Sequence, residues 1–223
     1  MQKLLRGLKQ FQREVFPHQR QLYESLAGGQ EPRALLITCG DSRVVPTLFT
    51  QTEPGELFIC RHVGNIVPPY GGPYGGVSAT VEYAVDALKV KHIIVVGHTD
   101  CGAMTAVLHP EKMASLPNVA GWLSYVSAAK QIVDALYPDA SEEERLHQLT
   151  ERNVLLQLKH LETHPPVAVA MAKGHVSLHG WMYHIDTGDV DAYDPESKQF
   201  VRITFSDQPT PIGDQPVEVG ANG

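Results

Sequence analysis

The sequence predicts an α/β fold, with a central, mainly parallel sheet, flanking helices and a helical arm at the N-terminus. Three continuous apolar runs of strand length, at 33–39, 56–63 and 92–98, are typical of parallel strands that are buried on both faces. Between the second and third runs, residues 77–90 place apolar side chains at helical spacing. Strand, helix and strand in this order indicate a crossover between parallel strands.

The arm, residues 1–28, is expected to contain two helices. An apolar stripe at helical spacing marks the first, and Pro17 is expected to stop or kink it. The second runs to Gly28 and Gly29, which are typical of a helix end. The stripe fits packing either on the arm's own domain or on a partner subunit, and both interpretations are open. Its members are Leu4, Leu5, Leu8, Phe11 and Val15.

The later elements follow from the same patterns. The chain is expected to turn helical after His98, and further helices are expected around 119–136 and 141–162. Residues 176–186 and 190–205 are expected to pair as a hairpin around Thr187–Asp189, at an edge of the sheet. No repeat or linker divides the chain, so we expect one domain over 1–206 and a flexible Pro/Gly-rich tail over 207–223.

Composition excludes several classes of protein. The 223 residues suffice for one domain with a core, and 43% apolar with 19% charged residues is ordinary for a globular protein. A net charge of −7 without a basic run argues against a nucleic-acid partner. The apolar runs are too short to span a bilayer, and the charged N-terminus lacks an apolar signal core. A cytoplasmic location is therefore expected.

Three potential metal ligands stand where predicted strands end. Cys39 ends the first strand, His98 ends the third, and Cys101 follows three residues later. The carboxyl ends of parallel strands meet at one edge of a sheet, where ligands bind. Two cysteines and a histidine leave one tetrahedral position of zinc open, which is typical of a catalytic site. The sequence therefore predicts one zinc ion per chain on these side chains.

Other interpretations of the cysteines are weaker. Three cysteines in a chain with no signal peptide argue against a disulfide framework, and Cys60 fits a core position within its strand. A phosphate-binding cysteine loop needs a wider gap than the one between Cys39 and Arg43. The glycine-rich segment 68–76 lacks the Gly-Lys-Ser/Thr of a phosphate-binding loop, so it is expected to form a turn.

Two motifs carry a family resemblance. CGDSRVVP (39–46) and GHTDCGAM (97–104) resemble the β-class carbonic anhydrases, whose pattern is Cys-x-Asp-x-Arg and, about sixty residues later, His-x-x-Cys-Gly. Further similar segments include GNIVPPYG, GVSATVEYAV, ERNVLLQLKHLETHP and LHGWMYHIDTG, so the likeness covers about residues 3–205. Within the family, the sequence resembles the bacterial form that is encoded beside cyanase.

The resemblance implies an enzyme that reversibly hydrates carbon dioxide to bicarbonate and a proton, by attack of a zinc-bound hydroxide. It implies zinc on the two cysteines and the histidine, and a paired dyad of Asp41 and Arg43, with Asp41 on the metal only in a closed state. It also implies a dimer or a dimer of dimers, in which arms wrap a partner subunit. The implied substrate pocket comprises Gln30, Phe58, Val63 and Tyr83, some of them from a second subunit, with the backbone N–H of Gly102.

The charges of this site predict its pH dependence. Two thiolates neutralise the zinc ion, so a bound water loses its proton less readily than at a site of neutral ligands. Activity is therefore expected to rise between about pH 7 and 9. Arg43 is expected to hold Asp41 off the metal while Asp41 accepts a hydrogen bond from the hydroxide. The alternative is a salt bridge that only fixes the turn.

Two positions depart from the family's pattern. His62 stands where asparagine is usual, and is either an extra proton acceptor or a surface or hydrogen-bonded histidine. Leu36 replaces the tryptophan of a regulatory bicarbonate site in some relatives, so that site is not expected. Two other functions remain open, a carbonyl sulfide hydrolase on the same scaffold and a zinc-bearing binding component without catalysis.

Overall fold

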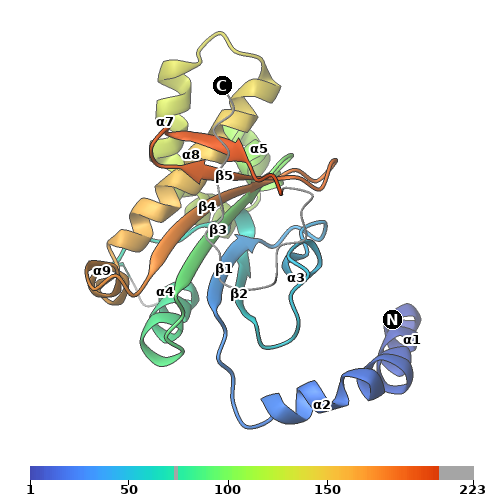
Figure 1. The fold of residues 1–223 in the computed structure, drawn as a ribbon. Helices are drawn as coiled ribbons and strands as arrows, with labels where there is room; N and C mark the ends of the chain where they lie inside the picture. Colours follow the sequence, from blue (N-terminus) through green and yellow to red (C-terminus); the bar gives the residue numbers. More distant parts are fainter. Residues whose placement is uncertain (73–74, 206–223) are drawn as a thin grey trace.

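A six-stranded sheet forms the centre of the computed structural model, which describes residues 1–72 and 75–205 (Figure 1). Its spatial order is β2-β1-β3-β4-β5-β6. Strands β2, β1, β3 and β4 are parallel, and β5 and β6 are antiparallel, which confirms the mainly parallel sheet. The strands are β1 (Ala34–Cys39), β2 (Leu57–His62), β3 (His92–His98), β4 (Ser177–Tyr183), β5 (Val190–Asp194) and β6 (Gln199–Arg202).

The end of the chain differs from the expected hairpin. β4 and β5 do pair around Thr187–Asp189, but β4 lies inside the sheet between β3 and β5, and only the second segment reaches the edge of the sheet, through β6. The segment 190–205 is divided into β5 and β6 because the carboxylate of Asp194 accepts hydrogen bonds from the backbone of Glu196 and Ser197 and forms a second turn. The predicted tail, 207–223, lies outside the described residues, as do Pro73 and Tyr74.

Helices cover both faces of the sheet. On one face, α4 (Gly76–Glu82) with its π-helical continuation (Tyr83–Ala87), α8 (Glu142–Glu162) and α9 (Pro165–Ala172) enclose the largest apolar cluster, in which Leu35 and Ile37 of β1 are fully buried. On the other face, Leu36 packs with Phe49 of the short helix α3 (Pro46–Phe49). Strands β1 and β3 therefore have the two-sided burial that their apolar runs predict, whereas the edge strand β2 is half-buried.

A second apolar cluster lies beside the carboxyl ends of the strands. It joins α5 (Gly102–Leu108), α6 (Pro117–Leu123), α7 (Ser127–Leu136) and α8, and includes Cys39 and Cys101. The helix expected over 119–136 is interrupted by a 3-10 turn at Ser124–Val126, and further 3-10 turns lie at Val63–Asn65 and Pro110–Met113. Ser141 caps α8, where its hydroxyl accepts from the Glu144 N–H.

The N-terminal arm lies away from the sheet (Figure 1). It runs through α1 (Gln2–Gln10), a π-helical turn (Phe11–Val15) and α2 (Phe16–Leu26), so the helical path continues past Pro17, which occupies the first turn of α2. No residue of these elements is buried. Among the residues described, no helix has the length and apolarity needed to cross a membrane.

Candidate metal centre

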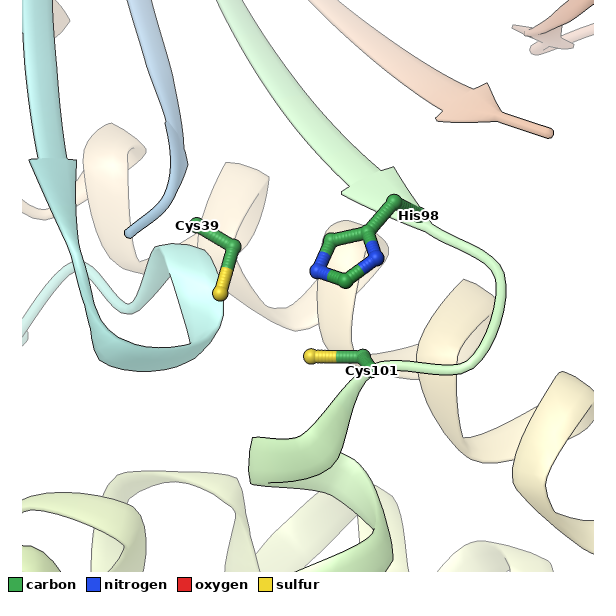
Figure 2. A group of neighbouring side chains, drawn as sticks. All are labelled: Cys39, His98 and Cys101. Carbon is green, nitrogen blue, oxygen red and sulfur yellow. The ribbon is translucent and has the colours of Figure 1, made fainter. Parts of the chain in front are cut away.

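Two neighbouring strands bring the three potential ligands together. Cys39 is the last residue of β1 and His98 is the last residue of β3, which pairs with β1 in parallel. Cys101 precedes α5, after a turn in which Asp100 has a left-handed backbone (φ 54°). The ligand atoms of these three residues lie within 4.8 Å of one another. Figure 2 shows both sulfurs and the imidazole directed into one space.

The environment of these atoms fits a metal ion. All three residues are buried, with His98 and Cys101 at 0% exposure. The Nδ1 atom of His98 lies 2.8 Å from the backbone oxygen of Thr99, and as the donor it fixes the tautomer that leaves an Nε2 lone pair. That Nε2 atom is buried and has no hydrogen-bond partner among the described residues. A buried imidazole nitrogen beside two thiols matches the ligand set of a catalytic zinc site.

The two thiols change each other's acidity. A hydrogen bond with Cys101 lowers the pKa of Cys39, and the same contact, with burial, raises the pKa of Cys101. The backbone N–H of Gly64 lies 3.4 Å from the Cys39 sulfur and also favours its thiolate. These contacts favour the thiolate form of Cys39 over that of Cys101.

Asp41 and Arg43 form a closed pair beside this cluster. The guanidinium donates to both carboxylate oxygens of Asp41, at 3.0 and 2.8 Å, and the Arg43 N–H donates to one of them at 3.0 Å. These bonds hold the pKa of Asp41 well below its usual range. The same guanidinium donates to the Asp100 carbonyl, which ties the two turns together. The Oδ2 atom of Asp41, which accepts one of the guanidinium hydrogen bonds, lies 4.0 Å from Nε2 of His98.

The residues expected to line the substrate pocket fall into two groups. Val63 follows β2, where His62 pairs with Cys39, and Gly102 follows Cys101 directly. These two positions therefore lie at the metal cluster. Val63 is 44% exposed, and the N–H of Gly102 belongs to the first turn of α5, where backbone donors lack helical partners.

The other three residues expected in the substrate pocket lie toward the end of the sheet that is farther from the metal cluster. Phe58 pairs with Leu35, four residues before Cys39, which is about 13 Å along the strand. Gln30 lies four residues before β1 begins. Tyr83 contacts Phe58, with ring centroids 5.9 Å apart, and is 50% exposed. A single chain therefore keeps these residues apart from its own metal cluster.

His62 is half-buried at the end of β2. Its ring packs edge-on against Trp122, with centroids 5.3 Å apart. Both ring nitrogens are buried, and the described part of the chain offers them no hydrogen-bond partner. Burial lowers the pKa of His62. A role as a proton acceptor stays a prediction.

Two residues that support the site, Arg61 and Gly64, were not predicted from the sequence. Arg61 donates to the backbone carbonyls of Cys39 and Asp41, at 3.3 and 2.8 Å, and so ties β2 to the turn that carries both. Gly64, the donor to the Cys39 sulfur, has a positive φ of 74°. The Gly-Asn pair after a strand was a signal for such a turn. No local signal identifies Arg61, because its contacts span some twenty residues.

The comparisons with known proteins agree with this geometry. The carbonic anhydrase family model matches residues 34–190. A carbonic anhydrase of Pseudomonas aeruginosa is 49% identical over 97% of this chain and 98% of its own. The β-carbonic anhydrase CcaA superposes with a TM-score of 0.89 at 43% identity, over 91% of this chain and 98% of that one. A tetrameric β-carbonic anhydrase of Sordaria macrospora gives 0.69 at 31% identity, over 86% and 92%. The chain belongs to the β-class carbonic anhydrases and is an enzyme of that family.

Proposed function

We propose that the protein hydrates carbon dioxide reversibly to bicarbonate and a proton, with one zinc ion per chain held by Cys39, His98 and Cys101. The observation that supports this most directly is the buried Nε2 atom of His98, which has no hydrogen-bond partner among the described residues and lies within 4.8 Å of two thiol sulfurs. When bound there, zinc would supply a Lewis acid that makes a water molecule nucleophilic near neutral pH.

Asp41 and Arg43 act on the proton and on access to the metal. The Arg43 guanidinium keeps the Asp41 carboxylate ionised and holds it in place, with one of its oxygens 4.0 Å from Nε2 of His98. An ionised carboxylate at that distance can accept a hydrogen bond from the attacking water and orient it. While Asp41 is paired with Arg43, it would leave the fourth coordination position of a bound metal free. Release of Asp41 from Arg43 would let the carboxylate become a fourth ligand.

The substrate pocket is proposed to form between two subunits. Val63 and Gly102 lie at the metal cluster of one chain, and Gln30, Phe58 and Tyr83 would come from the partner, because they lie toward the far end of their own sheet. The aromatic side chains suit an uncharged, apolar substrate, and the Gln30 amide and the Gly102 N–H suit its oxygens. The exposed stripe of the arm would pack on that partner, in a dimer or a dimer of dimers. The tetrameric Sordaria relative supports such an assembly.

Other expectations stay predictions. The cytoplasmic location rests on the sequence, and the link to cyanate breakdown rests on the family resemblance alone. Nothing in the geometry favours carbonyl sulfide over carbon dioxide. The closed Asp41–Arg43 pair beside the cluster argues against a zinc-binding component without catalysis, which has no need of it.

Stopped-flow measurement of carbon dioxide hydration against pH, with metal analysis of the same sample, tests the proposal. We expect about one zinc per chain and turnover that rises between about pH 7 and 9, because two thiolates make the bound water less acidic. Stoichiometric zinc without hydration at pH 8.5 would favour the binding component. A flat profile would contradict the charge argument.

A further inference from the structure

A row of polar side chains on α8 faces the segment that follows β2. Asn153, Gln157 and His160 are spaced four and three residues apart, so they share one face of the helix. Asn153 and Gln157 are completely buried, at 0% exposure, beside the apolar side chains of the main core. Burial of an amide is costly unless its hydrogen bonds are satisfied, so the partners of these two side chains show what the row holds.

The amides form a chain of hydrogen bonds with a defined direction. The Val67 N–H donates to Oε1 of Gln157 at 2.8 Å, Nε2 of Gln157 donates to Oδ1 of Asn153 at 2.8 Å, and Nδ2 of Asn153 donates to the Gly64 carbonyl at 3.1 Å. A backbone N–H can only donate and a carbonyl can only accept, so both amide orientations are fixed. Nδ1 of His160 lies 2.7 Å from the Val67 carbonyl and adds a further contact to the same segment.

Gly64 connects this chain to the metal site. Its carbonyl is held by Asn153, and its N–H lies 3.4 Å from the sulfur of Cys39. Gly64 and Asn65 both have positive φ angles, of 74° and 46°, which turn the backbone so that the two groups of Gly64 serve different partners. Side chains pack closely around the turn, since a Cβ atom on Gly64 would lie 3.2 Å from the Cβ atom of Ala103.

We propose that Asn153 and Gln157 are positioning residues of the metal site, which act through Gly64 on the Cys39 sulfur. The inference rests on the proposed function, because Cys39 must be a metal ligand. An N–H donor draws electron density from a thiolate and fixes its direction, so it sets both the strength and the position of the ligand. Loss of such an outer partner typically costs about 10- to 100-fold in metal affinity or activity.

Two variants and a matched control test the inference. Asn153→Asp removes the donor to Gly64 at nearly constant volume, and Gln157→Met removes every hydrogen bond of the Gln157 amide at similar length. Thr150→Val is the control, because Thr150 is also buried on α8, at 2% exposure, and its hydroxyl donates to the Leu146 carbonyl of its own helix. Zinc affinity is measured by competition with a chromophoric chelator. The cobalt-substituted protein gives the energy of the sulfur-to-metal charge-transfer band.

We expect both variants to lower zinc affinity by about 10- to 100-fold and to move the charge-transfer band, while Thr150→Val changes neither. If the zinc affinities of both variants lie within about twofold of the control and the charge-transfer band does not move, the amides only stabilise the fold. This conclusion holds even if the variants unfold at a lower midpoint. If Asn153→Asp does not fold, Gln157→Met decides the question alone. Absence of the band in the wild-type protein would instead overturn the proposed ligand set, and the inference with it.

Discussion

The exposed stripe of the arm allows a quantitative test of assembly. Leu4 and Leu8 lie on one face of α1 and are 70% and 52% exposed. Complete burial of a leucine contributes about 1.5–3 kcal/mol, so covering the exposed parts of these two contributes about 1–2 kcal/mol each. In a symmetric dimer both arms are covered, so four leucine side chains are buried in total. The double variant Leu4→Gln/Leu8→Gln removes all four contributions and is therefore expected to weaken association by about 4–8 kcal/mol. The dissociation constant then rises roughly a thousandfold or more.

Sedimentation velocity over a dilution series measures this change, with stopped-flow turnover and zinc content recorded on the same samples. The variant is expected to dissociate at low concentration, to keep its zinc, and to lose turnover with the partner's pocket residues. Arg6→Gln/Lys9→Gln is the control, because it changes two polar side chains of α1 that do not belong to the apolar stripe. If the leucine variant sediments like this control at every concentration, the stripe does not lie in the interface. If its monomers retain full turnover, the pocket is not shared between subunits.

Three further outcomes are expected. Asp41→Asn should retain zinc but lower turnover by about 10²-fold or more; unchanged turnover would mean that the pair with Arg43 only fixes the turn. Because the pKa of Asp41 is depressed in the fold, its stabilising effect is present above the unfolded value of about 4 and is lost as pH falls below it. The difference in unfolding midpoint between wild type and Asp41→Asn should therefore be constant from about pH 6 to 8 and shrink toward pH 3, and a constant difference at all pH values would contradict this assignment. Gly97→Ala should destabilise the protein by about 1–3 kcal/mol, since its Cβ atom would lie 2.7 Å from Val154 and 2.9 Å from Met182; calorimetry should show a midpoint lower by about 2–12 °C, and an unchanged midpoint would mean that these side chains move aside.

The centre of the fold and the metal cluster could be predicted because their signals are local. The apolar runs of β1 and β3 indicate strands that are buried on both faces, and strand ends are where ligands gather. Cys39, His98 and Cys101 could therefore be grouped without knowledge of any side-chain position. The family's motifs added the roles of Asp41 and Arg43.

What the sequence did not reveal depends on contacts between distant segments. Asn153 contacts Gly64 across 89 positions, and polar residues on a helix ordinarily indicate its solvent face. Helix α9 was missed because Pro165 and Pro166 indicate a break, although proline is also favourable in the first turn of a helix. The second turn at Asp194 depends on side-chain bonds to the backbone that no apolar periodicity records.

The pairing of β1 with β3 has a consequence for folding. Cys39 and His98 end adjacent strands but are separated by about sixty residues of chain, so a metal ion that binds both closes a long loop. Such an ion can stabilise the native state only after residues 92–101 have been synthesised and β3 has docked beside β1, because the unfolded chain offers no preformed site. Metal loading would then report that β1 and β3 have paired, and chelation should first increase amide hydrogen exchange at the carboxyl ends of these two strands.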